Sequence, residues 1–564
     1  MNNSQLRRMW IIVIGLVFTT VIIIGRLVAF QIIQGEEWAA KTADELVVIA
    51  RPERGVIYDR NGAVLAANGA DYQIGVSPNL VINPDEVANQ LAVILEQPRH
   101  EIMGALQSSA PFVMLAGRVS SDIAERVRQV NAQYGGLQID PLPRRFYPQG
   151  DLMCHTLGYV DFDGNGGAGI EGYYQTELAG EAASATINIS PFYVQQSVIA
   201  REGADMVLTI DRSVQYMVEK HLKEAMVEWG AESGTIIVME PKTGAILAMA
   251  SEPCFTPDGF YKAPEEMLFN PIVSRQFEPG SVMKLITMAA ALDSGAVTPQ
   301  TTYYDSGELW VGGHRTVNWD RAAHGTVDMT TLLSRSLNVG AATITTWMGA
   351  DTYYDYMRRF NFGSPTGIDI MSEAGGLMPL PGDALWTESF MATNSYGQSL
   401  AVTPLQMIAS VSAIANGGEL MQPYVVQEVH TANGTFIHQP AVLSRPISQE
   451  TARQVTAMAV TAVASEVPEA RVDGYTIAGK TGTAQIAENG VYLQEDTIAS
   501  FIGWLPADNP EIIVFIKLDK PQVSPWGSTT AAPTFAKLAN ELVVLLGIPP
   551  DNMRQQEDVM ALRN

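Results

Sequence analysis

Hydrophobic positions divide the chain into a short apolar segment at its start and a long mixed remainder. Residues 9–25 carry no charge, and residues 27–33 continue the apolar stretch beyond Arg26. A helix rises about 1.5 Å per residue, so this first run is near the lower limit for crossing a bilayer, and Arg26 can extend to the headgroups. The pattern therefore predicts a transmembrane anchor over residues 9–33.

The charges beside the apolar segment predict its orientation. Arg7 and Arg8 precede it, and no acidic residue occurs before Glu36. The positive-inside rule then places residues 1–8 in the cytoplasm and the rest of the chain outside. The alternative is a cleaved signal peptide, which needs small residues at its cleavage site. The nearest candidate, at 38–40, has Trp in the −3 position and meets that requirement poorly.

Residues 36–201 have a mixed, glycine-rich pattern. Residues 54–66 read as strand, turn and strand, and the Asn-Gly pair at 61–62 is a strong hairpin signal because both residues tolerate positive φ. Five glycines in 161–172 indicate a loop held close to other backbone. No repeat and no group of catalytic residue types occurs here. We interpret this part as a spacer or docking module.

Residues 202–548 show a more regular alternation. Apolar runs separated by turn signals predict five strands, two early and three late, with a long helical insert between them. Hairpins imply antiparallel pairing, so the expected fold class is α+β, with a five-stranded antiparallel sheet flanked by helices. The polar tail, 549–564, is expected to be loose. The predicted strands are 234–240, 245–250, 475–478, 498–505 and 511–518, and the clearest helices are 214–229 and 533–546.

Composition excludes several classes of protein. The chain has 564 residues, 47% hydrophobic and 17% charged, which is too apolar for a mostly disordered chain. Its net charge of −25 argues against nucleic acid as a partner, because phosphate binding needs clustered Lys and Arg. The two cysteines, Cys154 and Cys254, exclude a disulfide scaffold and a cysteine-ligated zinc site. The seven histidines show no ligand spacing, so we expect no metal and no cofactor.

Ser281 and Lys284 form the first candidate for chemistry. A Pro-Gly turn precedes Ser281 and an apolar helical run follows it, so both side chains lie on one face at the start of a helix. A serine hydroxyl is a weak nucleophile until a base takes its proton, and a buried lysine near another cation can be that base. No other lysine in the chain has Ser three residues earlier. By itself the pair reads equally well as an N-capping serine beside a solvated lysine.

Two further short motifs follow along the chain. Ser336-Leu337-Asn338 offers a hydroxyl that can relay a proton and an amide that can hold a substrate amide. Lys480-Thr481-Gly482-Thr483 offers a cation for a carboxylate, a glycine that admits a substrate backbone, and the backbone N–H of Thr483. Each motif has a duplicate, at 77–79 and at 242–244, and neither is diagnostic alone. Both duplicates precede Ser281, whereas the order Ser-x-x-Lys, Ser-x-Asn, Lys-Thr-Gly is that of the serine penicillin-recognising enzymes.

With these motifs in order, the chain resembles a class B penicillin-binding protein, a membrane-anchored peptidoglycan D,D-transpeptidase, over nearly its whole length. Two departures are visible. The family usually has Thr-Phe where Val282-Met283 stand, and it often has Gly-Gln-Gly where Gly397-Gln398-Ser399 stand. The sequences of residues 277–295 and 318–338 are more similar to the cell-division branch of the family than to its elongation branch. The spacer part, residues 36–201, resembles the family's pedestal domain at 54–62, 145–148, 157–160 and 169–172. The catalytic part adds similarity at 415–418 and 526–527.

The resemblance implies a mechanism by covalent acyl transfer. Ser281 would attack the penultimate D-Ala carbonyl of a donor stem peptide and Lys284 would accept its proton. Backbone N–H groups of Ser281 and Thr483 would form the oxyanion hole. The remaining expected roles are proton relay to the leaving D-Ala by Ser336, binding of the substrate amide by Asn338, and binding of the donor carboxylate by Lys480, Thr481 and Thr483, beside Gly482.

The resemblance also implies partners and a location. They are peptidoglycan stem peptides, β-lactams, the membrane through one helix, and a glycan polymerase of the shape, elongation, division and sporulation type, in the bacterial plasma membrane with the catalytic domain outside the cytoplasm. Three rival functions stay open. A D,D-carboxypeptidase or β-lactamase would transfer the acyl group to water, a β-lactam sensor would need a signalling part larger than residues 1–8, and a non-catalytic scaffold would have no reason to retain the whole motif set.

Overall fold

The computed structural model describes residues 3–29, 45–50, 52–188, 200–384, 386–488 and 491–561. It contains two compact units. Unit 1 is Met1–Glu53 with Gly180–Gly203, and unit 2 is Arg54–Ala179 with Ala204–Asn564. In unit 1, strand β1 (Glu45–Ala50) pairs antiparallel with β6 (Ala183–Asn188). The boundaries expected from the sequence, with a pedestal at 36–201 and a catalytic domain at 202–548, remain predictions.

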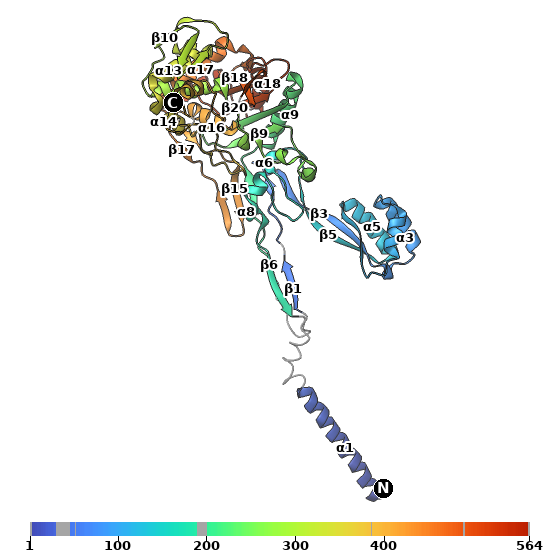
Figure 1. Ribbon diagram of the computed structural model, residues 1–564. Coiled ribbons are helices and arrows are strands. Elements are labelled where there is room, and N and C mark those ends of the chain that lie inside the picture. Colours follow the sequence, from blue (N-terminus) through green and yellow to red (C-terminus); the bar gives the residue numbers. More distant parts are fainter. Residues whose placement is uncertain are drawn as a thin grey trace. The chain divides into compact units, whose positions relative to one another are not determined.

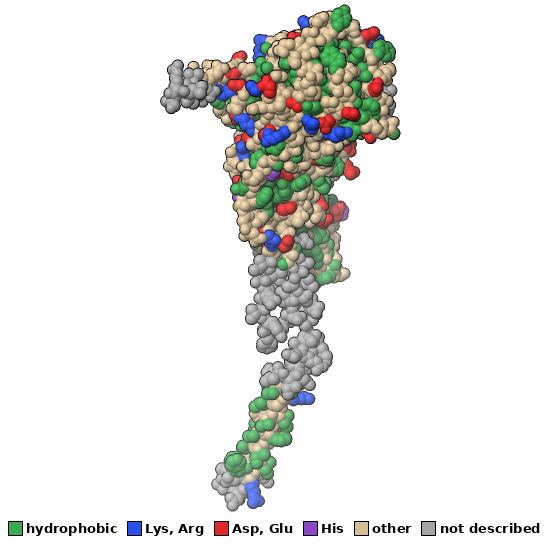
Figure 2. Space-filling view, turned by 90° about the vertical axis from the view of Figure 1, so that its left-hand side faces the viewer, with side chains coloured by type: hydrophobic (Ala, Val, Ile, Leu, Met, Phe, Trp, Pro, Cys, Tyr) green, Lys and Arg blue, Asp and Glu red, His purple; other side chains and the backbone are tan. Residues whose placement is uncertain are grey.

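Unit 1 also contains the apolar helix predicted at the N-terminus. Helix α1 spans Asn3–Val28, and its segment Met9–Val28 has a mean hydropathy of 2.6 over a length that can cross a membrane. Hydrophobic side chains cover the visible face of this helix, and none of the segment is buried against protein (Figure 2). The final residues of the predicted anchor, 30–33, lie outside the described residues.

The first part of unit 2 is a sheet with three helices packed on it. The hairpin predicted at 54–66 is confirmed, because β2 and β3 pair antiparallel across a turn in which Gly62 has a φ of 83°. Helices α3 and α5 pack beside β3 and β5 (Figure 1), over a separate apolar core. The strands are β2 (Ile57–Tyr58), β3 (Val64–Val76), β4 (Val113–Val119) and β5 (Leu137–Phe146), and the helices are α3 (Pro84–Ile94), α4 (Arg99–Leu106) and α5 (Ser121–Tyr134).

This sheet continues into strands from later in the chain. β2 pairs in parallel with β7 (Asp205–Leu208), which pairs with β15 (Val426–Thr431), and β16 (Gly434–Ile437) follows at the edge. The glycine-rich loop beside it is held close to backbone, as predicted: a Cβ at Gly166 would lie 1.8 Å from the carbonyl oxygen of Glu171.

A buried ion-pair network fixes the same region. The carboxylate of Glu171 lies 2.6 Å from Nε of Arg54 and 2.6 Å from Nε of Arg145. The Glu171 side chain is fully buried and the two arginines nearly so. Because all three charged groups are removed from water, the carboxylate and the two guanidinium groups need one another for charge compensation. This network joins the segment before β2, the end of β5 and the short helix α7 (Gly169–Tyr173).

The second part of unit 2 is built around a five-stranded antiparallel sheet, which confirms the predicted fold class. The strand order is β18-β19-β20-β8-β9, and every neighbouring pair is antiparallel. One strand is corrected. The residues 475–478 were expected to form it, whereas β18 starts at Ala478 and runs through the Lys-Thr-Gly motif. The strands are β8 (Ser233–Met239), β9 (Ile246–Glu252), β18 (Ala478–Glu488), β19 (Val491–Leu505) and β20 (Ile512–Asp519).

The two faces of this sheet contribute to different cores because neighbouring residues of a strand point to opposite faces. Ile236 and Val238 of β8 pack with α9 (Arg212–Trp229) and α18 (Ala531–Leu545). Ile237 and Met239 belong to the core that contains α11 (Met283–Asp293) and α16 (Pro404–Ala415). The predicted strands were continuous apolar runs, and burial on both faces is the reason.

The structure of the C-terminal tail differs from a second expectation. Residues 549–564 were expected to be loose, but α19 spans Asp551–Ala561. Asp551 accepts hydrogen bonds from the backbone N–H and the hydroxyl of Thr476, and Arg554 lies 2.6 Å from Asp508. These contacts with distant segments, which a local pattern cannot reveal, hold the start of the helix. Residues 562–564 lie outside the described part.

The remaining helices and strands complete unit 2. The helices are α6 (Cys154–Leu157), α8 (Gln175–Ala179), α10 (Pro271–Ser274), α12 (Met329–Ser334), α13 (Asn338–Met348), α14 (Ala350–Arg359), α15 (Glu388–Asn394) and α17 (Gln449–Glu466), and the strands are β10 (Thr302–Asp305), β11 (Glu308–Val311), β12 (His314–Val317), β13 (Gly325–Asp328), β14 (Leu420–Met421) and β17 (Val442–Ser444).

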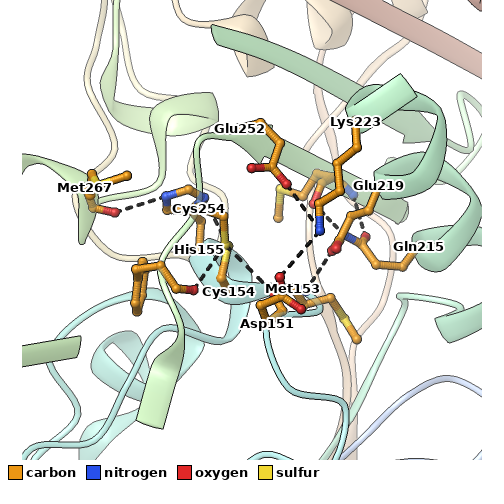
Figure 3. The surroundings of a disulfide bond; sticks show 12 residues. Asp151, Met153, Cys154, His155, Gln215, Glu219, Lys223, Glu252, Cys254 and Met267 are labelled. Atoms are coloured by element: carbon orange, nitrogen blue, oxygen red, sulfur yellow. Dashed lines mark hydrogen bonds and ion pairs between the residues drawn. A yellow bond between two sulfur atoms is a disulfide. The ribbon is translucent and has the colours of Figure 1, made fainter. Parts of the chain in front are cut away.

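A disulfide joins the two parts of unit 2. Cys154 on α6 is bonded to Cys254, just beyond the end of β9, across a sequence separation of 100 (Figure 3). The sequence predicted no disulfide scaffold, and the single bond between its two cysteines was missed. Beside the bond, the backbone N–H of Met153 donates to Glu219 on α9 at 2.8 Å, and Nε2 of His155 lies 3.0 Å from the carbonyl oxygen of Met267.

Candidate active site

Ser281 lies in a tight turn that leads into α11, a helix whose residues 283–292 are all buried. A 3₁₀ turn over Gly280–Val282 precedes α11, and Gly280 has a φ of +59°, a conformation that favours glycine. Lys284, in the first turn of α11, places its Nζ 2.9 Å from Oγ of Ser281. The i, i+3 spacing predicted from the sequence therefore brings both side chains to the same face.

Lys284 is fully enclosed by polar groups from a second segment. Its side chain is buried, and its Nζ lies 2.7 Å from the carbonyl oxygen of Ser336, 3.1 Å from Oγ of Ser336 and 2.6 Å from Oδ1 of Asn338. Burial, and secondarily the charge of Lys480, holds the pKa of Lys284 well below its usual value. The ammonium form is thereby disfavoured and the neutral amine favoured.

Ser336 lies in the link between α12 and α13, and Asn338 is the first residue of α13. Ser336 has a φ of +59°, a left-handed conformation that turns the chain sharply between the two helices. Asn338 begins α13, and its amide donates to the carbonyl oxygen of Val317 at 3.1 Å. That bond leaves Oδ1 of Asn338 directed at Lys284.

Lys480, Thr481, Gly482 and Thr483 lie on β18, at the edge of the sheet. Gly482 is required by packing, because a Cβ there would lie 2.3 Å from Oγ of Ser500 and 2.9 Å from a methyl group of Val282. The hydroxyl of Thr483 accepts a hydrogen bond from the backbone N–H of Gly527 at 3.2 Å. The glycine thus lets β18 approach the turn that carries Ser281.

Lys480 is the second buried lysine of the site. Its Nζ lies 3.3 Å from the carbonyl oxygen and 3.4 Å from the hydroxyl of Thr481. Burial lowers the pKa of Lys480 to about 8, against a smaller opposing effect of Glu466. At neutral pH this lysine is therefore mostly charged, while Lys284 is the one whose charge is more strongly suppressed.

Six of the predicted site residues line one cavity of about 580 Å³, whereas Lys284 and Gly482 are not among its lining residues. It brings together Ser281, Ser336, Asn338, Lys480, Thr481 and Thr483, and the duplicates at 77–79 and 242–244 do not contribute to it. Sequence reasoning missed several of its residues. The sequence contained a signal for two of them, Gln398 and Trp526, because the Gly397-Gln398-Ser399 segment departs from the family pattern and the Trp526-Gly527 pair resembles it. The missed lining residues are Trp319, His324, Ser334, Arg335, Tyr396, Gln398, Glu466, Val467, Trp526 and Ser528.

No cofactor or metal role follows from the described residues. Within the described ranges, the one group of side chains close enough to share an ion is Cys154, His155 and Cys254. Its two sulfur atoms are bonded to each other, so neither is available as a thiolate ligand. This group is also separate from the residues that line the catalytic cavity.

Comparisons with known proteins agree with this geometry. Residues 234–540 match the penicillin binding protein transpeptidase domain, and residues 49–199 match the penicillin-binding protein dimerisation domain. The chain is 32% identical to stage V sporulation protein D of Bacillus subtilis, covering 97% of this chain and 87% of that protein. It is 29% identical to the probable peptidoglycan D,D-transpeptidase PbpC of Pseudomonas aeruginosa, covering 99% of both.

Solved structures show the same similarity. The crystal structure of penicillin binding protein 3 from Mycobacterium tuberculosis, complexed with aztreonam, superposes with a TM-score of 0.69 at 27% identity, covering 89% of this chain and 98% of that one. A peptidoglycan synthetase from Bifidobacterium adolescentis superposes with a TM-score of 0.72 at 26% identity, covering 90% and 98%. With its dimerisation and transpeptidase domains in order and its three motifs around one cavity, this chain belongs to the class B penicillin-binding proteins.

Proposed function

We propose that this protein is a peptidoglycan D,D-transpeptidase that cross-links stem peptides through an acyl-enzyme on Ser281 and is inhibited covalently by β-lactams. The observation that carries the proposal is the environment of Lys284, a buried lysine within hydrogen-bonding distance of two serine hydroxyls and two carbonyl-type oxygens. The names of the relatives support the same activity.

The neutral form of Lys284 explains how Ser281 becomes nucleophilic. A neutral amine has two protons and one lone pair. The carbonyl oxygen of Ser336 and Oδ1 of Asn338 can only accept, so they take the two protons, at 2.7 and 2.6 Å. The lone pair then faces Oγ of Ser281, whose proton it accepts as the hydroxyl attacks the substrate carbonyl.

The other motif residues receive the substrate. The backbone N–H groups of Ser281 and Thr483 stabilise the oxyanion of the tetrahedral intermediate, and one such donor typically contributes about 10²–10³ in rate. Charged Lys480, with the hydroxyls of Thr481 and Thr483, binds the terminal carboxylate of the donor. Ser336 passes the proton from Lys284 to the departing D-Ala, and Asn338 holds the substrate amide.

The second half of the reaction separates the candidate functions. In a transpeptidase, the amine of a neighbouring stem peptide attacks the acyl-enzyme. In a carboxypeptidase or a β-lactamase, water does so. The complete motif set around one cavity disfavours a non-catalytic scaffold, since a scaffold needs no buried lysine whose charge is suppressed.

We place the catalytic part outside the cytoplasm, on a single membrane helix in the bacterial plasma membrane. The basic residue Arg7 before the apolar segment supports that orientation, and so does the disulfide, since such bonds persist in oxidising compartments. A role at the division septum is supported by the similarity to the cell-division branch. A glycan polymerase of the shape, elongation, division and sporulation type is the proposed partner.

Labelling with fluorescent penicillin tests the proposal. The purified full chain should acquire one adduct, seen by intact mass and mapped to the peptide that contains Ser281. Ser281→Ala should abolish it, whereas Ser77→Ala, in the duplicate Ser-x-Asn segment, should not. An adduct that persists for minutes to hours supports a transpeptidase over a β-lactamase, and rapid turnover supports a β-lactamase. Labelling that survives Ser281→Ala would refute the assignment of the nucleophile.

A further inference from the structure

A carboxylate three residues before the nucleophile bridges two other segments of the site. Glu278 is partly buried, and its Oε1 accepts a hydrogen bond from the backbone N–H of Ser399 at 2.8 Å. The hydroxyl of Tyr492 donates to the same carboxylate, 3.0 Å from Oε1 and 3.1 Å from Oε2. None of the catalytic motifs includes these three residues, which we call the Glu278 bridge.

The first partner belongs to a turn that packs on the nucleophile loop. The backbone N–H of Gly280 donates to the carbonyl oxygen of Gly397 at 3.0 Å. A Cβ at Gly397 would lie 2.1 Å from the carbonyl oxygen of Gly280, so the two backbones are in direct contact. Gln398 lines the catalytic cavity. Ser399 itself has a φ of +62°, an uncommon conformation for a residue with a side chain, and in that conformation its N–H reaches Glu278.

The second partner belongs to the strand pair that carries the other half of the site. Tyr492 lies near the start of β19 and is paired with Ala487 of β18. Lys480–Thr483 occupy the same β18, and a Cβ at Gly280 would lie only 3.0 Å from the carbonyl oxygen of Thr483. The turn with Ser281 and the strand with Thr483 are therefore in direct contact, and the Glu278 bridge joins the hairpin to the nucleophile loop at a further point.

We propose that Glu278 is a positioning residue that holds the β18–β19 hairpin against the nucleophile loop and so sets the distance between the two oxyanion-hole N–H groups. Those groups come from Ser281 and Thr483, on two elements far apart in sequence. A donor aimed at the oxyanion acts in the transition state more than in the ground state. The bridge should therefore affect the acylation step and leave the prior non-covalent binding nearly unchanged. This inference rests on the proposed function.

The test separates binding from acylation for the full chain with fluorescent penicillin. Stopped-flow labelling over a range of concentrations gives the dissociation constant of the non-covalent complex and the first-order acylation rate. Tyr492→Phe removes the hydroxyl and keeps the ring, and it should lower the acylation rate about tenfold because small displacements of catalytic groups are costly, with the dissociation constant within twofold. Glu278→Ala should be slower still, and the double variant should be no slower than Glu278→Ala alone.

A matched control exists at the other end of the nucleophile helix. The hydroxyl of Tyr356 donates to Asp293, the last residue of α11, at 2.9 Å, so Tyr356→Phe removes the same kind of bond. Its acylation rate should equal that of the wild type. Ser399→Gly keeps the N–H that Glu278 uses and removes a hydroxyl that interacts with Tyr492. Because both contacts of the Glu278 carboxylate are kept, it should also acylate within twofold of the wild type.

Each outcome decides the matter. A normal acylation rate in Tyr492→Phe, an equal loss in Tyr356→Phe, or a change confined to the dissociation constant would overturn the inference. A tenfold or greater loss in Ser399→Gly would show that more than the N–H of residue 399 is used, and would overturn it too. Failure of the wild type itself to be labelled counts against the proposed function, because every comparison is made relative to the wild type.

Discussion

We expect the disulfide between Cys154 and Cys254 to stabilise the folded protein, which can be tested by adding a reductant. A cross-link stabilises mainly by restricting the unfolded chain, and the effect grows with the length of the closed loop. The two cysteines are 100 residues apart. For a loop of that size the chain-entropy relation gives about 4.7 kcal/mol at 25 °C. Reduction replaces the bond by two thiols and leaves the covalent structure of the neighbouring residues unchanged.

That free energy converts into a modest shift of the melting temperature. The roughly 490 residues of unit 2 have an unfolding entropy of about 1 kcal/mol/K at the average value per residue. The expected decrease in Tm is therefore about 5 °C when the part on both sides of the bond unfolds together. Differential scanning calorimetry of the full chain, with and without dithiothreitol, measures it directly, and alkylation followed by mass spectrometry verifies that both thiols are free.

The control is the variant Cys154→Ala/Cys254→Ser, whose Tm should not respond to dithiothreitol. Cys154 is buried, so alanine avoids placing an unpaired hydroxyl there. If the oxidised and reduced wild type melted within about 1 °C of each other, the entropy argument would be refuted for this loop. The bonds that remain, from Met153 to Glu219 and from His155 to Met267, would then suffice to hold α6 in place.

Three further changes have defined outcomes. Burial lowers the pKa of Lys284 most, and the charge of Lys480 adds to that effect. Lys480→Gln removes this charge, so the pKa of Lys284 should rise and the acid limb of the acylation rate should move to higher pH; a pH profile of penicillin labelling measures the shift. Gly482→Ala should lower the free energy of unfolding by about 1–3 kcal/mol, measured by denaturant unfolding, and should slow acylation strongly, because its Cβ would lie 2.3 Å from the hydroxyl oxygen of Ser500. The control Gly117→Ala, whose Cβ would meet no atom within 4 Å, should change neither. Glu171→Ala should destabilise the protein by about 3–5 kcal/mol in the same assay, because it leaves two buried arginines without a carboxylate.

The sequence alone predicted the parts of the fold that depend on local pattern. The apolar N-terminal segment, the hairpin at 54–66, the helix at 214–229 and the strand pair at 234–250 all follow from periodicity and turn chemistry, and the structure has each of them. Where a boundary depended on tertiary pairing, the pattern was insufficient. β18 runs through the Lys-Thr-Gly motif because β19 supplies its hydrogen bonds, and α19 forms because distant segments hold its first turn.

The candidate site divides in the same way. Three short motifs in a fixed order identified the nucleophile, its base and the residues of β18, because that chemistry restricts both residue type and order along the chain. The bond between Cys154 and Cys254 and the bridge from Glu278 to Ser399 and Tyr492 could not be read from the sequence. Both join residues at least 100 positions apart, and no local spacing encodes such a contact. Only the packing of the folded chain brings those atoms within bonding distance.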